Sequence, residues 1–344
     1  MVVPVRCLVQ FWDDVEEAIA YMKEVNHSEF YSLIEGFEWV PFTQTLAYNR
    51  SLVDEKTLHF YIDDESNPSI GCVGYERRKA GLKMLCVNGE CLLRAEAIDR
   101  KAYSEFYKEL QETGFDIYSL NINTPYNFDA EIGLRTAGWL RPVGMFSTEL
   151  SKIIPTTEPM KLDRSWKHNL KKAHQTGLSF SVGTGIDEKV IEEYVAHHEE
   201  LLQRKGFNDT LDAKGLKELS RDSHYKIGLV RNSAGQTVAG HLFYEHPLAS
   251  SSMYAFTSPE GRESGAAFML YEGILAHLSE QGIARFDVGR LSPAAHKKNN
   301  IFLFKDGLGG EYVQYLGEWE FCRKKWMSVA LYFMKRDIWK RVRV

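Results

Sequence analysis

The apolar and polar positions of the first 153 residues alternate between the period of a strand and that of a helix. Residues 57–64 and 68–78 are predicted strands separated by a polar turn, and residues 116–124 form a third. Residues 13–25 begin with acids and continue with apolar positions at helical spacing, which predicts an amphipathic helix. Residues 99–114 begin with an aspartate and end with a glycine, which are typical start and stop residues of a helix.

The alternation resumes after residues 154–162, where two prolines and two threonines predict a linker. The predicted elements are helices at 163–177, 187–206 and 265–282, a hairpin of 225–232 with 237–246, strands at 250–258 and 283–290, and a strand-like aromatic run at 301–305. We therefore expect an α/β (α+β) chain with two related units, residues 1–153 and 154–320, followed by a basic aromatic helix over 321–344.

The bulk composition bounds the class of protein. A chain of 344 residues with 44% hydrophobic and 26% charged residues is typical of a globular protein with more than one core. The net charge of −5 does not indicate a nucleic-acid binder at the level of the whole chain. Five cysteines without a CxxC pair favour reduced thiols in the cytoplasm over a structural zinc site. No signal peptide and no membrane-spanning segment are expected.

The segment between the strand at 250–258 and the next helix carries candidate anion-binding residues. These are Arg262, Ser264, Gly265, Ala266 and Ala267. The N–H groups at a helix start bind anions, small residues let the backbone approach closely, and an arginine can hold phosphate oxygens in bidentate fashion. A solvated turn whose alanines pack the helix onto a sheet explains the same residues equally well, so both interpretations stay open.

Two further stretches are basic. Residues 163–177 carry Arg164, Lys167 and Lys171 with no acid after the first position, which suits a phosphorylated partner or simply a solvated helix face. The helix expected over 321–344 combines basic residues with aromatic ones. Such a helix can lie on an anionic membrane, hold RNA phosphates, or dock its aromatic side onto the protein.

The stretch from 286 to 321 carries candidate catalytic residues. Asp287 and Arg290 end a predicted strand, His296 lies in a polar loop, and Lys305 follows Phe304 before a glycine-rich turn. A lysine in a cleft can stabilise an oxyanion, whereas at the surface it has no special role. No metal site is expected, because the adjacent histidines at 197 and 198 point in different directions from one helix. No GxSxG, GxxxxGK[ST] or GxGxxG motif is present.

Three segments together resemble the FemABX peptidyltransferase group of the GNAT acyltransferase superfamily. They are WVPFTQTLAYNRSL at 39–52, DRSWKHNLKKAHQTGLSF at 163–180, and FDVGR at 286–290 followed by IFLFKDGLGGEYVQY at 301–315. The resemblance spans roughly residues 39–320. It implies two tandem GNAT-like domains, each a mixed, mostly antiparallel sheet flanked by helices, with the donor bound by the second domain.

The resemblance also implies roles for individual residues. Arg262, Gly265 and Ala267 match the superfamily loop that holds the pyrophosphate of acyl-CoA. Lys305 matches a family lysine associated with substrate binding and the transition state. Backbone N–H groups near Tyr254 and Ala255 are expected to polarise the donor carbonyl, and His296 or Asp287 to relay a proton. The expected substrate-binding residues are Arg164, Lys167, Lys171, Arg290 and Phe304.

We therefore expect an N-acyltransferase that uses acyl-CoA and acts on a small-molecule, lipid-linked or nucleotide-linked amine of cell-envelope metabolism. The expected location is the cytoplasm, with peripheral contact to the inner membrane face through the C-terminal helix. One alternative is an aminoacyl-tRNA-dependent transferase of the peptidoglycan-bridge type, in which Lys167 and Lys171 contact tRNA phosphates. Another alternative is a protein that binds acyl-CoA or a nucleotide sugar without catalysis.

Overall fold

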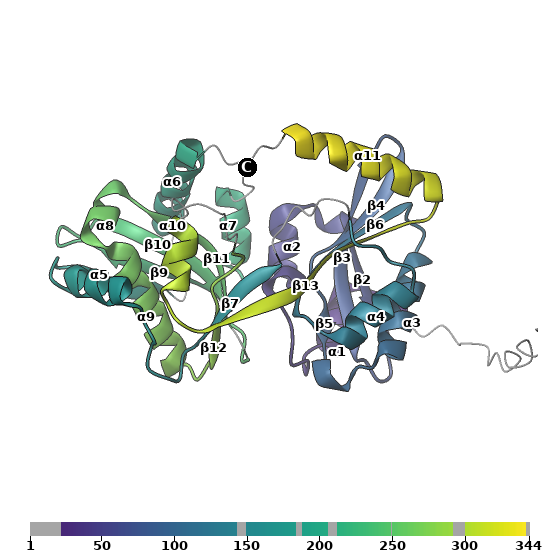
Figure 1. Cartoon of the computed structure of the whole chain (residues 1–344), viewed down its shortest axis with the longest axis horizontal. Coiled ribbons are helices and arrows are strands. Elements are labelled where there is room, and N and C mark those ends of the chain that lie inside the picture. Colours follow the sequence, from purple (N-terminus) through teal and green to yellow (C-terminus); the bar gives the residue numbers. More distant parts are fainter. Residues whose placement is uncertain are drawn as a thin grey trace, which may run out of the picture.

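The computed structural model describes residues 22–142, 149–183, 188–205, 212–248, 250–291 and 300–341. Two α/β halves lie side by side, and we call them the N-terminal half (residues 22–142) and the C-terminal half (residues 149–322) (Figure 1). Their strands join in one sheet with the order β1-β2-β3-β4-β6-β13-β7-β12-β11-β10-β9-β8. Among the described strand pairs, β4–β6 and β11–β12 are parallel and the rest are antiparallel.

The elements of the N-terminal half follow in this order: β1 (Lys23–Val25), α1 (His27–Leu33), the 3-10 helix η1 (Phe42–Gln44), α2 (Leu46–Leu52), η2 (Glu55–Thr57), β2 (Leu58–Ile62), β3 (Ile70–Lys79), β4 (Leu82–Val87), β5 (Cys91–Leu92), η3 (Ala95–Ala97), α3 (Arg100–Gln111), β6 (Ile117–Pro125) and α4 (Phe128–Thr136). Helices α3 and α4 cover one face of the sheet, where Leu110, Leu120 and Trp139 are buried. Helix α1 covers the other face through Phe30.

The remaining elements are β7 (Leu150–Pro155), α5 (Arg164–His174), β8 (Ser179–Gly183), α6 (Glu188–Lys205), α7 (Ala213–Leu219), β9 (Tyr225–Arg231), β10 (Thr237–Tyr244), β11 (Ser250–Thr257), α8 (Pro259–Ser264), α9 (Ala266–Glu280), β12 (Arg285–Asp287), α10 (Asn300–Asp306), β13 (Glu311–Cys322) and α11 (Lys325–Arg341). Successive residues face opposite layers because side chains alternate along a strand. Leu242 packs towards α6 and α7, and Phe243 packs towards α5 and α9.

The two halves repeat one arrangement of elements. In each half, three antiparallel strands (β2-β3-β4 and β9-β10-β11) lead into a helix (α3 and α9). A strand parallel to the third strand of the set (β6 and β12) follows that helix. The mixed sheet and the repeat confirm the predicted fold class of two tandem units.

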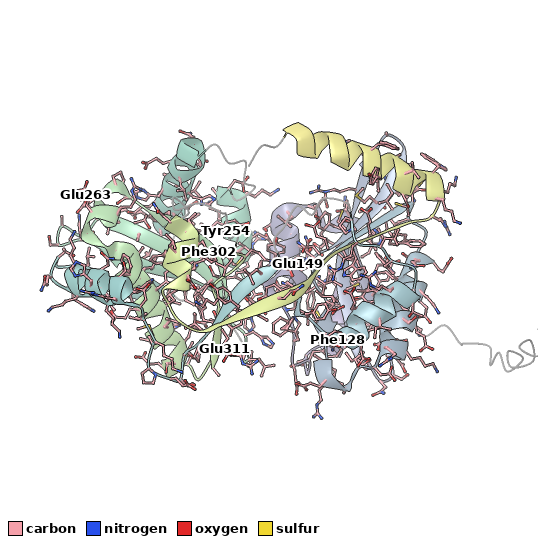
Figure 2. The ribbon with its side chains drawn as sticks, viewed as in Figure 1. Phe128, Glu149, Tyr254, Glu263, Phe302 and Glu311 are labelled. Atoms are coloured by element: carbon pink, nitrogen blue, oxygen red, sulfur yellow. The ribbon has the colours of Figure 1, made fainter. Side chains whose placement is uncertain are left out.

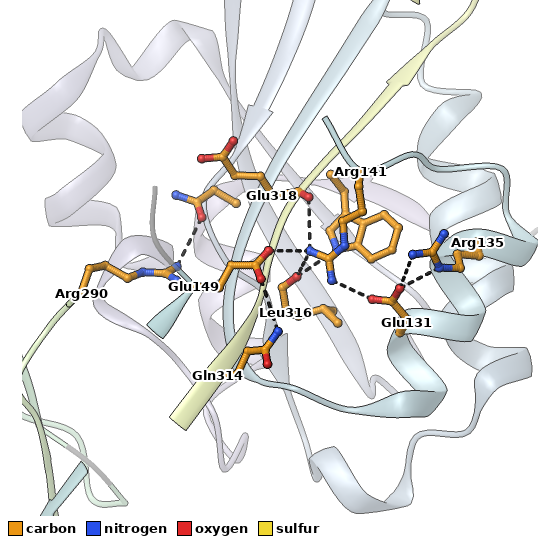
Figure 3. A network of polar contacts seen from close by, with 10 residues as sticks. Glu131, Arg135, Arg141, Glu149, Arg290, Gln314, Leu316 and Glu318 are labelled. Carbon is orange, nitrogen blue, oxygen red and sulfur yellow. Dashed lines mark hydrogen bonds and ion pairs between the residues drawn. The ribbon is translucent and has the colours of Figure 1, made fainter. Parts of the chain in front are cut away.

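Strand β13 joins the halves. Its first part pairs with β7 and its second part with β6, and the register shifts between Tyr315 and Gly317. Gly317 has a left-handed φ of +74°, which favours glycine, and the Glu149 side chain lies directly beside it. The guanidinium of Arg141 donates to carbonyls of Leu316 and Glu318 (Figure 3).

Arg141 also binds two carboxylates, with Nη1 2.9 Å from Glu149 and Nη2 2.7 Å from Glu131. Its guanidinium lies 4.0 Å from the centre of the Trp319 ring. These contacts hold the crossing strand against the N-terminal half. Strand β13 (Glu311–Cys322) runs across the domain boundary predicted at residue 320. The predicted domain limits stay predictions.

Several predicted elements differ from the structure. The part of the predicted helix at 13–25 that lies within the described residues is strand β1, which pairs with β2. The aromatic run at 301–305 is helix α10 instead of a strand. Tertiary packing decides this case, because Phe304 lies 4.9 Å from Trp166 and 5.1 Å from Tyr271 between ring centres. None of the helices within the described ranges has the length and apolarity that a bilayer span requires.

Candidate functional site

A cavity of about 580 Å³ lies between the two halves. The N-terminal half contributes Phe42, Thr43, Tyr48, Asn88, Asn121 and Asn123, and the C-terminal half contributes Ser252, Met253, Tyr254, Asp287, Gly289, Arg290, Lys305 and Tyr315. We call this the inter-half cavity. It brings Lys305, Asp287, Arg290 and Tyr254 of the predicted site residues together from separate stretches of sequence.

One part of the cavity wall from the N-terminal half is the segment that contains η1 and α2. The Gln44 side chain is completely buried and holds η1 onto strand β3, since its amide donates to Val73 O and its oxygen accepts from Val73 N. The same segment docks on the other half, where the Thr45 hydroxyl lies 2.5 Å from the Tyr225 hydroxyl. Phe42 and Tyr48 are therefore fixed against the cavity from the N-terminal side.

Lys305 is the cationic group of the cavity. Helix α10 places it so that its ammonium nitrogen lies 3.5 Å from the carbonyl oxygen of Arg290. Burial lowers the pKa of Lys305 from 10.5 to about 8, and the charge of Asp287 opposes that shift. The backbone of Gly289, with φ of +78°, passes so close that a Cβ there would lie 3.6 Å from the ammonium nitrogen. Lys305 is thus a desolvated cation at neutral pH.

Asp287 lies at the end of β12, and its carboxylate oxygens are already engaged. They accept hydrogen bonds from the Gly289 N–H at 2.8 Å and from the hydroxyl groups of Ser151 and Tyr315. These hydrogen bonds fix the position of the carboxylate. This arrangement favours Asp287 as a fixed negative charge that supports Lys305, over the proton relay expected from the sequence.

Arg290 reaches from the C-terminal half to the N-terminal half. Its guanidinium lies 4.6 Å from the centre of the Tyr315 ring, and Nη2 donates to the side-chain oxygen of Asn121 at 3.3 Å (Figure 3). Burial lowers the pKa of Arg290 from its usual value. Arg290 therefore supplies a second positive charge at the same wall as Lys305.

Behind the cavity wall lies a buried polar group that was not singled out from the sequence. His241 on β10 is completely buried, and its Nε2 lies 2.8 Å from the hydroxyl oxygen of Ser252 on β11. Burial, assisted by the charge of Lys305, lowers the pKa of His241 to about 3. Tyr271 on α9 lies beside the Ser252 side chain, and burial raises the pKa of its phenol to about 12.

The parallel strands of the two halves differ beside the cavity. In the N-terminal half β4 and β6 pair over four positions, Met84–Val87 with Ile117–Leu120. In the C-terminal half β11 and β12 pair only at Ser250 and Ser251, after which they separate. Tyr254, which follows this separation, lines the cavity, and Ala255 is exposed. The opening of β11 from β12 is the gap in which the donor carbonyl was expected from the sequence.

The predicted phosphate loop, Arg262–Ala267, is a closed turn and does not line the cavity; we call it the Gly265 turn. Helix α8 precedes Gly265, whose φ is +77° and whose N–H bonds to Gly261 O. Helix α5 packs against it, so that a Cβ at Gly265 would lie 3.3 Å from Ala173. The guanidinium of Arg262 donates to Thr257 O at 2.8 Å, and Ala266 is completely buried.

Figure 2 shows how far apart these two regions are. Glu263, which belongs to the Gly265 turn, is at the outer end of the C-terminal half, whereas Tyr254 lies towards the middle of the molecule. The Thr176 hydroxyl and the Lys172 ammonium of the α5 segment donate to carbonyls of Ser264 and Glu263. These bonds join the turn to the α5 segment, and the binding of a pyrophosphate there stays a prediction.

The remaining predicted residues lie elsewhere. Arg164, Lys167 and Lys171 are exposed on the outer face of α5, since Trp166 and Ala173 occupy its inner face. They do not line the inter-half cavity, which separates them from Arg290. Phe304 packs in the core of the C-terminal half, where its carbonyl accepts from the Trp166 indole at 2.7 Å. His296 lies outside the described residues.

The cavity residues of the N-terminal half were missed as site residues. Phe42, Thr43 and Tyr48 belong to the segment 39–52, whose family resemblance was the signal that could have found them. No sequence signal pointed to Asn88, Asn121 and Asn123, because single asparagines after and along strands are common. Their side chains become a group only when β4 and β6 pair beside the other half.

A second, larger cavity of about 740 Å³ lies between α2 and α7. Its charged groups neutralise one another: Arg50 lies 2.7 Å from Glu55 and 3.9 Å from Glu218, and Arg221 also pairs with Glu218. Within the described ranges, no group of three His, Cys, Asp or Glu side chains is arranged to hold a metal ion. The inter-half cavity, with its desolvated lysine, is the better candidate for a reaction site.

Comparison with known proteins identifies the class of fold. Residues 161–298 match the family model described as an acetyltransferase (GNAT) domain, and no curated protein sequence matches the chain. The structure is similar to that of FemX, with a TM-score of 0.73 and 11% identity over 91% of this chain and 99% of that chain.

Two other solved structures share the arrangement. L-PGS from Bacillus licheniformis gives a TM-score of 0.60 and 12% identity over 91% of this chain and 97% of that chain. A tandem GNAT protein from the clavulanic acid biosynthesis pathway gives a TM-score of 0.50 and 10% identity over 88% of this chain and 98% of that chain. At these low sequence identities, the similarity shows a shared fold and nothing about activity.

Proposed function

We propose that this chain, a FemABX-like member of the GNAT superfamily, is an acyltransferase that moves an acyl or aminoacyl group to an amine in the inter-half cavity. The observation that carries the proposal is Lys305, a desolvated cation whose pKa is lowered to about 8 at the wall of that cavity. A buried cation beside a cavity suits a reaction in which negative charge develops on an oxygen.

The reaction begins with the attack of a neutral amine on the carbonyl carbon of the donor. A C–N bond forms, and the carbonyl electrons move onto oxygen, where the Lys305 ammonium stabilises them. The carbonyl then re-forms and expels the donor's alcohol or thiol, which departs with the proton that the amine loses. Asp287 keeps a negative charge near Lys305, and the two halves hold donor and acceptor together, which lowers the entropic part of the barrier.

For the donor, the packing around Gly265 favours an aminoacyl ester such as aminoacyl-tRNA. A GNAT pyrophosphate site needs an open helix start, and here α8 and α5 occupy the approach to α9. The exposed cations Arg164, Lys167 and Lys171 on α5 suit tRNA phosphates. A structure with a similar fold is described as the C-terminal domain of a lysylphosphatidylglycerol synthetase from Agrobacterium fabrum, and its name includes a lysyl group.

Acyl-CoA is the second candidate donor, and it was the donor expected from the sequence. The separation of β11 from β12 after Ser251 leaves a gap of the kind that a pantetheine arm can enter. The GNAT domain match covers this region, and the similar tandem GNAT protein is described in a form without acetyl-CoA, which names that molecule as its ligand. For the acceptor we propose a nucleotide-linked or lipid-linked amine of cell-envelope metabolism.

The test is a transfer assay with both donors and separate binding measurements. Acetyl-CoA, longer acyl-CoAs and radiolabelled aminoacyl-tRNAs are each combined with UDP-linked peptidoglycan precursors, and thermal stability is measured with each donor. We expect radiolabel to move from aminoacyl-tRNA to the acceptor, with tRNA binding that weakens steeply with salt. Transfer from acyl-CoA alone would establish the second donor. Donor binding without turnover for any donor would indicate a non-catalytic binding protein.

The C-terminal helix supports a further proposal about location. Trp326, Val329, Tyr332 and Phe333 are exposed on α11, and Arg323–Lys325 beside them are basic. Their spacing places the four apolar side chains on one helix face, which suits contact with an anionic membrane surface on the cytoplasmic side.

Sedimentation with phosphatidylglycerol–phosphatidylcholine vesicles tests this contact. We expect Trp326→Ala with Phe333→Ala to release the protein, whereas Phe128→Ala, an exposed aromatic on α4 (Figure 2), leaves binding unchanged. Binding to RNA in place of vesicles would contradict the membrane proposal.

A further inference from the structure

Ser252 presents its hydroxyl group at the cavity wall beside Lys305. It is the first residue of β11 after the pairing with β12 ends, and it lines the inter-half cavity. A Cβ at Gly289 would lie 3.7 Å from the Ser252 hydroxyl oxygen and 3.6 Å from the Lys305 ammonium nitrogen. The hydroxyl and the ammonium group therefore flank the same point of the wall.

The direction of the hydrogen bond between His241 and Ser252 decides what the serine can do. His241 is buried and neutral, so one ring nitrogen carries a proton and the other does not. Within the part of the chain that the structure describes, Nδ1 has no hydrogen-bond partner. Buried N–H groups are left without an acceptor more rarely than acceptor lone pairs are left empty. The proton therefore belongs on Nε2, from which it is donated to the Ser252 oxygen.

Tyr271 on α9 lies beside the same serine. Its phenol stays protonated, because burial raises its pKa to about 12. A serine oxygen has two acceptor lone pairs and one proton. The histidine N–H fills one lone pair of the Ser252 oxygen, so the serine's own proton is left to point into the cavity, and a protonated phenol beside it can fill the second lone pair.

We propose that Ser252 is a catalytic hydrogen-bond donor, which shares with Lys305 the oxyanion formed during transfer, and that His241 and Tyr271 are positioning residues that fix its direction. This inference rests on the proposed function. The other use of a serine beside a histidine is as a nucleophile, which requires the histidine to accept the serine proton. His241 cannot do so effectively near neutral pH, since burial and Lys305 keep its ring neutral.

The first test reads the hydrogen-bond direction without any activity. The ¹⁵N shifts of the His241 ring are measured in the full chain between pH 5 and 8, roughly the range in which an ordinary histidine titrates. We expect the Nε2–H tautomer throughout, with no titration. An Nδ1–H tautomer would overturn the proposal, because Ser252 would then donate to His241 and have no proton for the cavity.

The second test is kinetic and uses the donor and acceptor that show transfer in the assay above. Ser252→Ala is expected to lower kcat about a hundredfold with KM nearly unchanged, as for loss of one oxyanion donor. Ser252→Thr, which keeps the hydroxyl, restores most of the rate. Ser181→Ala, at an exposed serine on β8, is the matched control and keeps the wild-type rate.

The outcomes separate this inference from the proposed function. A wild-type rate in Ser252→Ala, together with an active wild-type protein, would contradict the role of Ser252 alone. Absence of transfer by the wild-type protein would contradict the proposed function and with it the role of Ser252. A covalent acyl adduct on Ser252, found by mass spectrometry after mixing with donor, would show a nucleophile and overturn the donor role.

Discussion

Lys305 in the inter-half cavity and the Gly265 turn are two candidate anion-binding features of the C-terminal half, and they differ in what surrounds them. Lys305 is desolvated but faces open space shared with the other half. At the turn, Gly265 N–H is bonded to Gly261, Arg262 is bonded to Thr257, and α5 covers the glycine. The Lys305 ammonium faces a cavity that can admit a substrate, whereas the Arg262 guanidinium and the Gly265 N–H are already bonded to backbone carbonyls.

The two regions also differ in why their key residues are present. The glycine of the turn is required by its left-handed φ of +77° and by the contact with Ala173, which are structural reasons. The burial of Lys305 lowers its pKa and thus costs stability, which core packing does not explain. Residues that weaken the fold and face a cavity are stronger functional candidates than residues that fit a short motif.

The largest expected effect is on transfer itself. Lys305→Ala should lower kcat/KM by about a thousandfold, because the charge that meets the oxyanion is lost. Arg262→Ala should change it less than about twofold, because its guanidinium serves a backbone carbonyl. The assay is radiolabel transfer at pH 7 under identical conditions. Equal losses of kcat/KM in the two variants would contradict the conclusion that Lys305 acts in the reaction and Arg262 does not.

The next effect is on the pH dependence of kcat. Lys305 is charged below its pKa of about 8, so its support of the oxyanion is present below that pH and lost as the pH rises through it. We expect the wild-type kcat to fall above about pH 8, roughly tenfold per pH unit. In Lys305→Arg the side chain stays charged, so this fall should disappear from profiles measured up to about pH 10. If kcat of Lys305→Arg still falls above about pH 8, the titrating group is not Lys305.

A smaller effect is expected on stability at the turn. Gly265→Ala should lower the free energy of unfolding by about 2 kcal/mol, through left-handed strain and the contact with Ala173, without changing kcat. Gly282→Ala is the matched control, since Gly282 also has a positive φ but open space around it. It should cost about 1 kcal/mol. Denaturant titration measures both, and loss of activity in the folded Gly265→Ala protein would restore the turn as a donor site.

The smallest effect has the opposite sign. Lys305→Met should stabilise the protein at pH 7 by about 1–3 kcal/mol, because a shift from 10.5 to about 8 means that the folded state disfavours the charged lysine. This cost is fully present below about pH 8 and is relieved as the pH rises towards 10.5. The gain should therefore vanish at high pH in thermal melts. A loss of stability at pH 7 would mean that Lys305 is well satisfied where it lies.

Much of the fold could be predicted from local sequence. Asp99 caps α3, as its position at the start of the predicted helix indicated. The hairpin of β9 and β10 and the helix α9 also follow from short-range signals. These elements are set by contacts within one turn or one hairpin, which a sequence pattern records directly.

The rest depends on contacts between distant segments. The pairing of β13 with both β7 and β6 needs the left-handed Gly317 and the Arg141 contacts, which no local pattern shows. Helix α10 forms where the aromatic alternation predicted a strand, because Trp166 and Tyr271 pack against Phe304.

The site divides in the same way. Lys305 and Arg290 could be singled out because the resemblance covers their segment. Ser252 and His241 could not, since a serine and a histidine on neighbouring strands acquire meaning only from their register and burial. The three asparagines of the N-terminal wall depend likewise on the meeting of the two halves.

The most direct measurement is a crystal structure of the protein with a non-reactive amide analogue of the donor that supports transfer. We expect the analogue's carbonyl oxygen to lie in the inter-half cavity, within about 3 Å of the Lys305 ammonium nitrogen or the Ser252 hydroxyl. An analogue whose phosphate lies on the Gly265 turn, with its carbonyl remote from Lys305, would contradict it.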